Sequence, residues 1–328
     1  MKAKKIVLAL AALTVFSSFA ACTNTDYKVR FNDYWEYNSL ANSTISETLV
    51  YKVTHEKGAG LDNIGYSLTY GEGEYVTTLK TQGEGYVYKT SLTMPVTFQY
   101  GKDDAVEVTD TVTSEVVFAR SGNALRPVSS KKAVVSHTPL SSAGASSDKC
   151  YELYDFTIIT NYPTEGDASS TATYKKYKTD PNSDVLIETT PVVNKSTFNF
   201  SNEDYSCLDN EQLLLALRAI SNSTTSGSFM AYSPFVGAMQ KIDFSFQTQT
   251  SAKFTYTLNG EEQKKDIDYR AVSLSIDDKN PGATQTAWIA TTTNPQKNEH
   301  RNVMLKLITP LSYSLGDLVY ELVSIVRA

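Results

Sequence analysis

Alternating apolar and polar side chains dominate this sequence and predict that most of it is β-strand. In the longest example, Tyr86 to Tyr100, one parity is largely apolar and the other polar. A two-residue period places each parity on its own face of a sheet, so one face is buried. Pro95 falls on the polar parity, which indicates a bend or an edge. Shorter runs lie at residues 49–53, 66–70, 112–118, 154–158, 242–246, 254–258, 272–276, 286–291 and 303–307.

The connections between these strands favour antiparallel hairpins. Asn259-Gly260 is the strongest signal, because this dipeptide suits a two-residue turn with positive φ angles. The stretches 71–73 and 83–85, each Gly-Glu-Gly, also indicate turns between strands. Residues 162–170 are polar and loop-like. One-sided strands joined by hairpins predict a mainly β fold, built on a large antiparallel sheet with one buried face.

One helix interrupts the strand pattern. Asp209 can cap its start, and Gln212 completes a capping-box pattern three residues later. Arg218 suits the last turn, where a positive charge interacts favourably with the helix dipole. The segment Leu318 to Val326 fits either a strand or a second helix, so one or two helices are expected on the sheet. The apolar stripe of the first helix consists of Leu213, Leu214, Leu217 and Ile220.

The N-terminus has the pattern of a bacterial secretory signal. Three lysines within residues 2–5 precede an apolar run over residues 6–16, and small residues follow. This run is shorter than the ~20 residues that span a bilayer core. Cys22 follows Ala20-Ala21, which resembles a lipoprotein signal. We therefore expect cleavage before Cys22 and anchoring to the extracytoplasmic face of the cell membrane through acyl chains such as palmitate.

One departure from the lipoprotein pattern leaves an alternative. Phe19 stands where such signals usually have Leu or another aliphatic residue. The alternative is ordinary cleavage within the alanine pair, which would leave the cysteine as a free thiol. We expect a signal peptide over residues 1–21, an anchor and tether over 22–45, and one β-rich domain over 46–328. A polar stretch permits a subdivision of this domain near residue 145.

Charge and composition exclude several partners. The chain of 328 residues has a net charge of −6, and losing residues 1–21 removes three lysines and makes it −9. An acidic surface repels phosphate backbones, so no nucleic-acid partner is expected. It also repels anionic lipid head groups, so the membrane contact is expected to come from the lipid at Cys22. No metal or cofactor motif is present, and none is expected.

The other two cysteines could form a disulfide. Cys150 and Cys207 are an even pair in an oxidising compartment once Cys22 carries lipid. The alternative is two buried, reduced thiols. Neither belongs to a CxxC motif, which argues against a zinc site or thiol redox catalysis.

The sequence argues against an enzyme. His55, His137 and His300 lie far apart, and no nucleophile elbow, phosphate-binding glycine loop or HExxH motif is present. No catalytic residue is therefore assigned. A hydrolase would require one of these histidines to meet a carboxylate within a cleft.

Aromatic residues are the feature of this sequence that could serve binding. The chain has 21 tyrosines and 13 phenylalanines, many of them on predicted strands. Tyrosine simply suits a half-buried sheet, which explains most of them. A sheet face too large for its helices would leave an apolar groove. The aromatic stretch 34–37 could instead stack on a sugar or a partner protein. The candidate groove-lining residues are Phe98, Phe118, Phe244 and Phe246.

Long amphipathic strands with few helices, behind a lipoprotein signal, resemble the lipoprotein-carrier half-barrel superfamily (LolA-like). The resemblance extends over about residues 46–326 and implies a curved sheet around an apolar cavity, with helices as a lid. Residues 209–220 best suit the lid. The segments 115–127 and 205–220 are also similar to uncharacterised lipoproteins of gut Firmicutes.

These observations lead to one functional expectation and one alternative. We expect a non-enzymatic, membrane-anchored lipoprotein that binds a lipid or other apolar ligand in its curved sheet. The alternative is a structural or interaction lipoprotein that binds a protein or glycan on the cell surface.

Overall fold

The computed structural model describes most of the chain from Ile45 onward and short pieces before it. The described residues are 29, 31–32, 35–36, 45–121, 124–140, 144–146, 150–163, 167–180, 183–199, 207–234, 238–276, 284–291 and 300–327. Within 167–199, the description covers the backbone alone. The predicted signal peptide, Cys22 and most of the predicted tether lie outside the described residues.

Seventeen strands form one sheet, as the alternation predicted. The strands are β1 (Ser46–Lys57), β2 (Ser67–Tyr70), β3 (Gly73–Gln82), β4 (Gly85–Gln99), β5 (Val106–Ser121), β6 (Ala124–Pro139), β7 (Tyr151–Asn161), β8 (Asp167–Asp180), β9 (Ser183–Asn199), β10 (Cys207–Asp209), β11 (Ser226–Ser233), β12 (Ala238–Phe246), β13 (Thr250–Leu258), β14 (Glu261–Ile276), β15 (Gln285–Ala290), β16 (Met304–Leu311) and β17 (Gly316–Arg327).

The strand order follows the chain except where its two ends meet. Antiparallel neighbours run β9-β8-β7-β6-β5-β4-β3-β1-β17-β16-β15-β14-β12-β11. The first and last long strands are therefore paired, along almost their whole length. Strand β2 extends the β4 ladder beyond β3, and β13 pairs with the first half of β14. The short β10 is parallel to β11.

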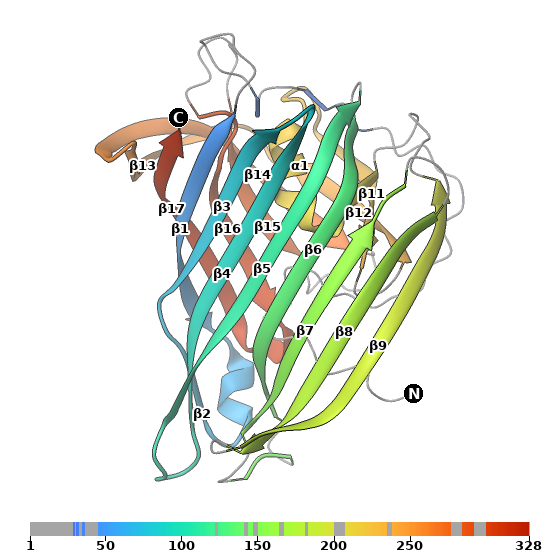
Figure 1. The fold of residues 1–328 in the computed structure, drawn as a ribbon. Helices are drawn as coiled ribbons and strands as arrows, with labels where there is room; N and C mark the ends of the chain where they lie inside the picture. The colour runs from blue at the N-terminus through green and yellow to red at the C-terminus, as the bar shows by residue number, and fades with distance from the viewer. Residues whose placement is uncertain are drawn as a thin grey trace.

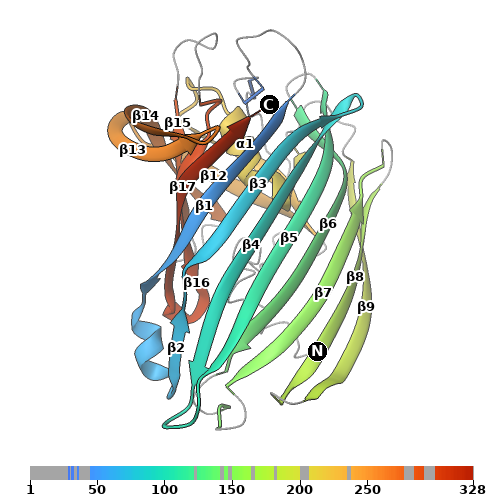
Figure 2. The same cartoon turned by 60° about the vertical axis from the view of Figure 1, so that its left-hand side comes forward.

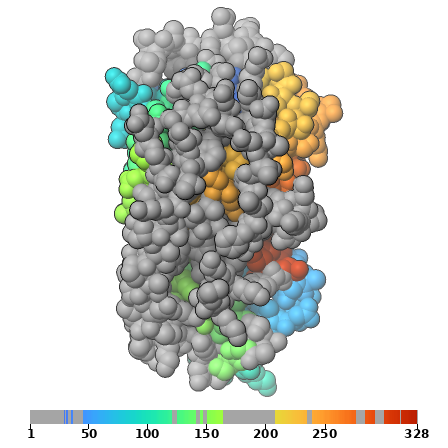
Figure 3. Space-filling model, turned by 90° about the vertical axis from the view of Figure 1, so that its right-hand side faces the viewer, coloured from blue at the N-terminus to red at the C-terminus, as the bar shows by residue number. Residues whose placement is uncertain are grey.

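The sheet curls into a barrel-like body. Figures 1 and 2 show β1 to β9 as one curved wall and β12 to β17 as the other. Strands β9 and β12 approach each other to within 8 Å between Cα atoms, so the wall nearly closes. This architecture confirms the expected large, curved antiparallel sheet. Figure 3 shows η3 (Ala59–Asn63), in blue, at the opposite end of the molecule from the yellow and orange segments that follow the helix.

The positions of residues within the strands agree with the alternation and turn signals in the sequence. In β4, Leu92, Met94 and Val96 are buried, while Pro95 lies on the exposed face, as its polar parity predicted. Asn259 and Gly260 have φ angles of 51° and 88° and join β13 to β14 in the predicted hairpin. The ambiguous C-terminal segment is strand β17, because both of its edges find partner strands.

Two long strands were missed by the alternation analysis. Strand β8 begins at Asp167, within the stretch that was expected to be loop, and β9 follows it. Their sequences are rich in Thr, Ser and Lys, so an apolar parity is weak there, and pairing rather than side-chain pattern identifies them. Strands β6 and β7, on either side of residue 145, are direct neighbours in the same sheet.

The predicted helix lies inside the curve of the sheet. A 3-10 turn, η4 (Asn210–Gln212), leads into α1 (Leu213–Ala219). The capping box of Asp209 and Gln212 is present as predicted. All seven residues of α1 are buried, and Figures 1 and 2 place it between the two walls. The helix thus lies within the curve of the sheet, whereas a lid would cover one open face. Among the described helices, none has the length and apolarity to cross a bilayer.

A short N-terminal segment, here called the strap (the described residues 29, 31–32 and 35–36), closes onto the helix. Phe31 forms an isolated bridge with Ile220, and the backbone N–H of Asn32 donates to the carbonyl of Ala219 at 2.6 Å. Phe31 is 5% exposed, so the strap belongs to the core. The strap therefore covers the C-terminal end of α1 and satisfies one of its carbonyl groups.

The second half of the strap packs on the sheet. Trp35 is fully buried and meets Tyr86 edge-on, with ring centroids 5.0 Å apart, and Phe118 at 6.0 Å. Glu36 accepts hydrogen bonds from Tyr86 Oη at 3.1 Å and Arg120 Nη1 at 2.8 Å. Because the indole is buried, Trp35 cannot offer a stacking surface to a sugar, which corrects that expectation for this residue.

Two glycines with positive φ give a direct test of this fold. Gly316 (φ 114°) starts β17, where a Cβ would lie 1.9 Å from the carbonyl oxygen of Glu56. Gly83 (φ 58°) lies in the β3–β4 turn, with nothing within 4 Å of a Cβ. We expect Gly83→Ala to cost about 1–2 kcal/mol of unfolding free energy, from backbone conformation alone. Gly316→Ala adds a backbone clash and should cost clearly more, as measured by urea denaturation. Equal costs would contradict the close β1–β17 approach.

Candidate functional site: a buried arginine cluster

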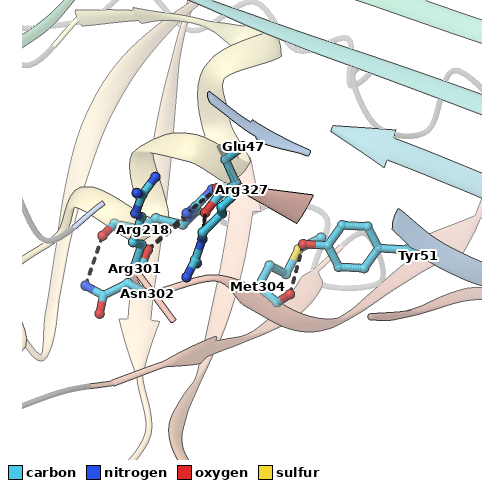
Figure 4. Close-up of polar contacts among 7 residues, drawn as sticks. All are labelled: Glu47, Tyr51, Arg218, Arg301, Asn302, Met304 and Arg327. Atoms are coloured by element: carbon cyan, nitrogen blue, oxygen red, sulfur yellow. Dashed lines mark hydrogen bonds and ion pairs between the residues drawn. The ribbon is translucent and has the colours of Figure 1, made fainter. Parts of the chain in front are cut away.

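Charged side chains from four distant parts of the sequence meet inside the barrel. Glu47 comes from β1, Arg218 from the last turn of α1, and Arg327 from the end of β17. Arg301 comes from the short segment before β16. Figure 4 shows these residues together beside the helix, and we call them the arginine cluster.

One carboxylate holds two guanidinium groups in this cluster. Glu47 Oε1 lies 2.8 Å from Arg218 Nη2, and Glu47 Oε2 lies 2.9 Å from Arg327 Nε (Figure 4). The side chains of Glu47 and Arg218 are 1% and 3% exposed. Burial alone would raise the pKa of Glu47, but the charges of Arg218 and Arg327 outweigh it and hold that pKa below its usual value. The carboxylate is therefore ionised at neutral pH.

The segment before β16 is fixed to the end of the helix. The carbonyl of Arg301 accepts from Arg218 Nε at 3.3 Å and Nη2 at 3.0 Å. Asn302 Nδ2 donates to the carbonyl of Arg218 at 3.1 Å. Arg301 and Asn302 have φ angles of 48° and 50°, an uncommon backbone conformation for residues other than glycine. These contacts hold the strained backbone in place.

A second buried polar group lies at the other end of the helix. Asp209 accepts hydrogen bonds from the backbone of Glu211 at 2.8 Å and from the hydroxyl of Tyr162. Burial and the charge of Glu211 raise the pKa of Asp209 to about 6, against hydrogen bonds from Ser130 and Tyr162. Glu211 also pairs with the buried Lys132 at 3.0 Å. The barrel interior is thus polar at both ends of α1.

The four phenylalanines expected to line a groove are buried, at 1%, 0%, 3% and 8% exposure, and lie apart from one another in two groups. Phe98 packs against Tyr66 and Tyr151, and Phe118 against Trp35 and Tyr86. Phe244 contacts Phe229 and Phe246, and Arg270 lies 4.0 Å above the ring of Phe246.

Two hollows that described residues line do not include these phenylalanines in their walls. One is a partly open cavity of about 20 Å³ beside the start of α1, lined by Tyr75, Leu92, Asn210, Leu213 and other residues. It has room for about one water molecule. The other is an open groove of about 340 Å³ across β3 to β6, lined mainly by Thr, Ser, Lys and Glu side chains.

The three histidines occupy unrelated positions. His137 Nδ1 lies 2.6 Å from Asp110 Oδ1, and the same oxygen accepts the backbone N–H of His137 at 2.8 Å. This pair joins β5 to β6 just beyond their last paired residues, and it lines neither hollow. His55 lies 2.9 Å from the carbonyl of Leu315, and His300 packs near Tyr256. Histidine does meet a carboxylate here, but outside either described hollow.

The thiol of Cys150 is free and buried, and Sγ lies 3.5 Å from the carbonyl of Ser146. The side chain of Cys207 lies outside the described residues, so the disulfide and its alternative, two buried reduced thiols, both stay predictions. Burial raises the pKa of Cys150. Within the described part of the chain, no three His, Cys, Asp or Glu side chains are placed to hold a metal ion.

The sequence pattern did not predict the arginine cluster, although one residue, Glu47, carries a signal for it. Glu47 shares the inward parity of Leu49, Tyr51 and Val53, so a charged residue stands on an otherwise apolar face. Such a residue needs a buried partner of opposite charge. Arg218 was recognised only as a helix-terminal cation, and nothing in the local pattern connects Arg301 or Arg327 to it.

No protein-family model matches the sequence, and no curated protein matches it. Among solved structures, the chain is similar to the crystal structure of a beta-barrel-like protein with a domain of unknown function (DUF1849) from Brucella abortus. The sequence identity is 10%, the match covers 87% of this chain and 98% of the other, and the TM-score is 0.43. Membership of the lipoprotein-carrier superfamily remains a prediction.

The arginine cluster predicts a large cost for removing its carboxylate. Glu47→Gln keeps the volume but leaves the buried Arg218 without its carboxylate partner and removes the ion pair between Glu47 and Arg327. We expect a loss of about 3–5 kcal/mol in unfolding free energy, measured by urea denaturation. The matched control is Glu115→Gln, which removes the exposed pair with Lys89 and should cost less than about 1 kcal/mol. Similar losses in both variants would contradict a central role for Glu47.

Asp209 predicts a distinct pH dependence. Its pKa is raised on folding, so the folded state binds the proton more tightly, and stability should fall as pH rises from about 4 to about 6. Asp209→Asn keeps an N-cap residue and removes the titration. In the wild type, the rise of the Asp209 pKa by about two units corresponds to a decrease on the order of 3 kcal/mol in unfolding free energy over this pH range, and we expect the variant to lack this decrease. Unfolding free energies at a series of pH values test it, and parallel profiles of variant and wild type would refute it.

Proposed function

We propose that this protein is a lipid-anchored extracytoplasmic protein whose barrel-like sheet binds an amphipathic or largely apolar small molecule, without catalysing a reaction. The observation that supports binding most directly is the arginine cluster. Buried ion pairs rarely stabilise a protein more than apolar residues of the same size would. Charged groups inside a barrel are therefore better explained by a bound molecule than by stability.

The anchoring part of the proposal rests on the sequence. Cys22 follows a charged segment, an apolar run and small residues, the arrangement of a lipoprotein signal. The strap supports it sterically, since the chain joins the folded body at Val29, seven residues after Cys22. Anchor and barrel are therefore separated by at most about 25 Å of extended chain.

A second function is favoured by the packed phenylalanines and the outer groove. Filled aromatic positions suit a protein that presents its outside to a partner. The groove across β3 to β6 carries Lys89, Glu115 and Lys131, which suits a polar partner such as a glycan or a peptide. The ligand experiment below discriminates between the two functions.

Replacing the anchor cysteine tests the localisation and supplies a soluble protein. Cys22→Ala should move the protein from the membrane fraction to the soluble extracytoplasmic fraction, because no acyl chain can be attached. Cys150→Ala is the matched control and should stay with the membrane. Membrane retention of Cys22→Ala would overturn the proposed anchor.

The soluble Cys22→Ala protein then tests binding. Native mass spectrometry, followed by solvent extraction, should reveal a co-purifying lipid or uptake of one molecule from a lipid mixture. A protein that purifies without ligand and takes up none would reject lumenal binding. It would favour the outer groove as the functional surface.

A further inference from the structure

We propose that the arginine cluster is a binding site for the acidic group of an amphiphile, a carboxylate or phosphate carried on an apolar chain. This inference deepens the proposed ligand-binding function and rests on it. It is carried by the state of one guanidinium group, Arg301, and by its position beside the buried pair of Glu47 and Arg218.

The described cluster has more positive than negative charge. Glu47 is ionised and faces Arg218 and Arg327, each within 3 Å. Arg301 adds a third guanidinium, which lies within electrostatic range of Glu47, Arg218 and Arg327. Burial, and after it the charge of Arg327, lower the pKa of Arg301 to about 10, although the charge of Glu47 acts in the opposite direction. Charge of one sign collected in a buried place favours the entry of an anion.

Arg301 is the member of the cluster best placed to receive it. The residue is 4% exposed, and Nη1 has no hydrogen-bond partner among the described atoms. Figure 4 shows no contact drawn to this guanidinium, whereas its carbonyl is held by Arg218. A buried, unpaired guanidinium N–H costs several kcal/mol unless a partner arrives.

The end of the helix does not supply the missing negative charge. The carbonyl of Arg218 already accepts from Asn302, and that of Ala219 accepts from Asn32. The Arg301 carbonyl is likewise occupied by Arg218. Each of these three carbonyl groups thus accepts another donor, and none is a partner of Arg301 Nη1, which can bind a group from outside.

The surroundings define the rest of the ligand. Tyr51, two residues along β1 from Leu49, is 1% exposed, lies within the field of Arg218 and donates its hydroxyl to the carbonyl of Met304 at 2.9 Å. Tyr75 packs against Tyr51 and, on another side, against Tyr320. A guanidinium beside aromatic surface suits an oxyanion with an apolar body, because the fork binds two oxygens while the rings contact the chain.

The test compares ligands that differ only in their head group. Dodecanoate, dodecyl phosphate and dodecanol are titrated calorimetrically into the Cys22→Ala protein. We expect dodecanoate or dodecyl phosphate to bind at least about tenfold more tightly than dodecanol, the gain of one charge-assisted contact. Arg301→Gln should remove this preference and leave dodecanol binding unchanged. Arg301→Lys keeps the charge but not the fork, so it should restore part of the preference.

Controls separate this inference from the function on which it rests. Arg126→Gln, the same substitution on β6 outside the cluster, should leave the affinities for all three ligands unchanged. Equal binding of dodecanoate and dodecanol by the wild type would overturn the anionic site and leave lumenal binding intact. Binding of none of the three would reject the proposed function itself. The last control titrates acetate and inorganic phosphate, which have no apolar chain. If either binds as tightly as dodecanoate and loses affinity in Arg301→Gln, the site binds a free anion, and the proposal of an amphiphilic ligand is overturned.

Discussion

The ion pairs of Glu47 with Arg218 and Arg327 are the constraint on which the rest of this structure depends. They connect the first strand, the lumenal helix and the last strand through one carboxylate. Glu47 and Arg218 are buried, so their geometry tolerates little movement before an uncompensated charge appears. The β1–β17 ladder brings Glu47 and Arg327 together as register partners. The sheet thus closes and the helix is positioned by the same contact.

Around that contact, the ends of separate segments satisfy one another. The C-terminal carbonyls of α1 accept hydrogen bonds from the strap and from Asn302, and Ile220 caps the helix by bonding to Leu217. A helix of seven residues is marginal alone. Its stability comes from burial on all sides and from these contacts. The strap in turn depends on Trp35, whose indole packs against Tyr86 and Phe118.

Much of this fold could be predicted from the sequence, because the signals are local. Alternation over Tyr86–Tyr100, the Asn259-Gly260 turn and the capping box at Asp209 each depend on residues close together in the chain. The same locality explains the failures. Strands β8 and β9 have little apolar alternation, and the pairing of β1 with β17 joins the two ends of the domain.

The candidate site could not be predicted from the sequence, because it too depends on contacts between distant segments. Its four charged residues come from four segments, and none is unusual within its own neighbourhood except Glu47, a carboxylate on an apolar parity. The alternation correctly predicts that the four phenylalanines face the inside of the sheet. It does not indicate whether an inward-facing ring lines a cavity or packs against another ring. In this structure all four meet other rings.

The position of Arg327 has a consequence for how the chain folds. Its contact with Glu47 spans 280 residues of sequence, so this contact can form only after β17 has been synthesised and has reached β1, whereas the contact with Arg218 spans a shorter stretch. Contacts of such separation slow folding, because a long loop must close before they form. Until then β1 presents an unpaired edge, an exposed template for association with other chains. Closure of the sheet within one molecule therefore competes with intermolecular strand pairing while the protein folds.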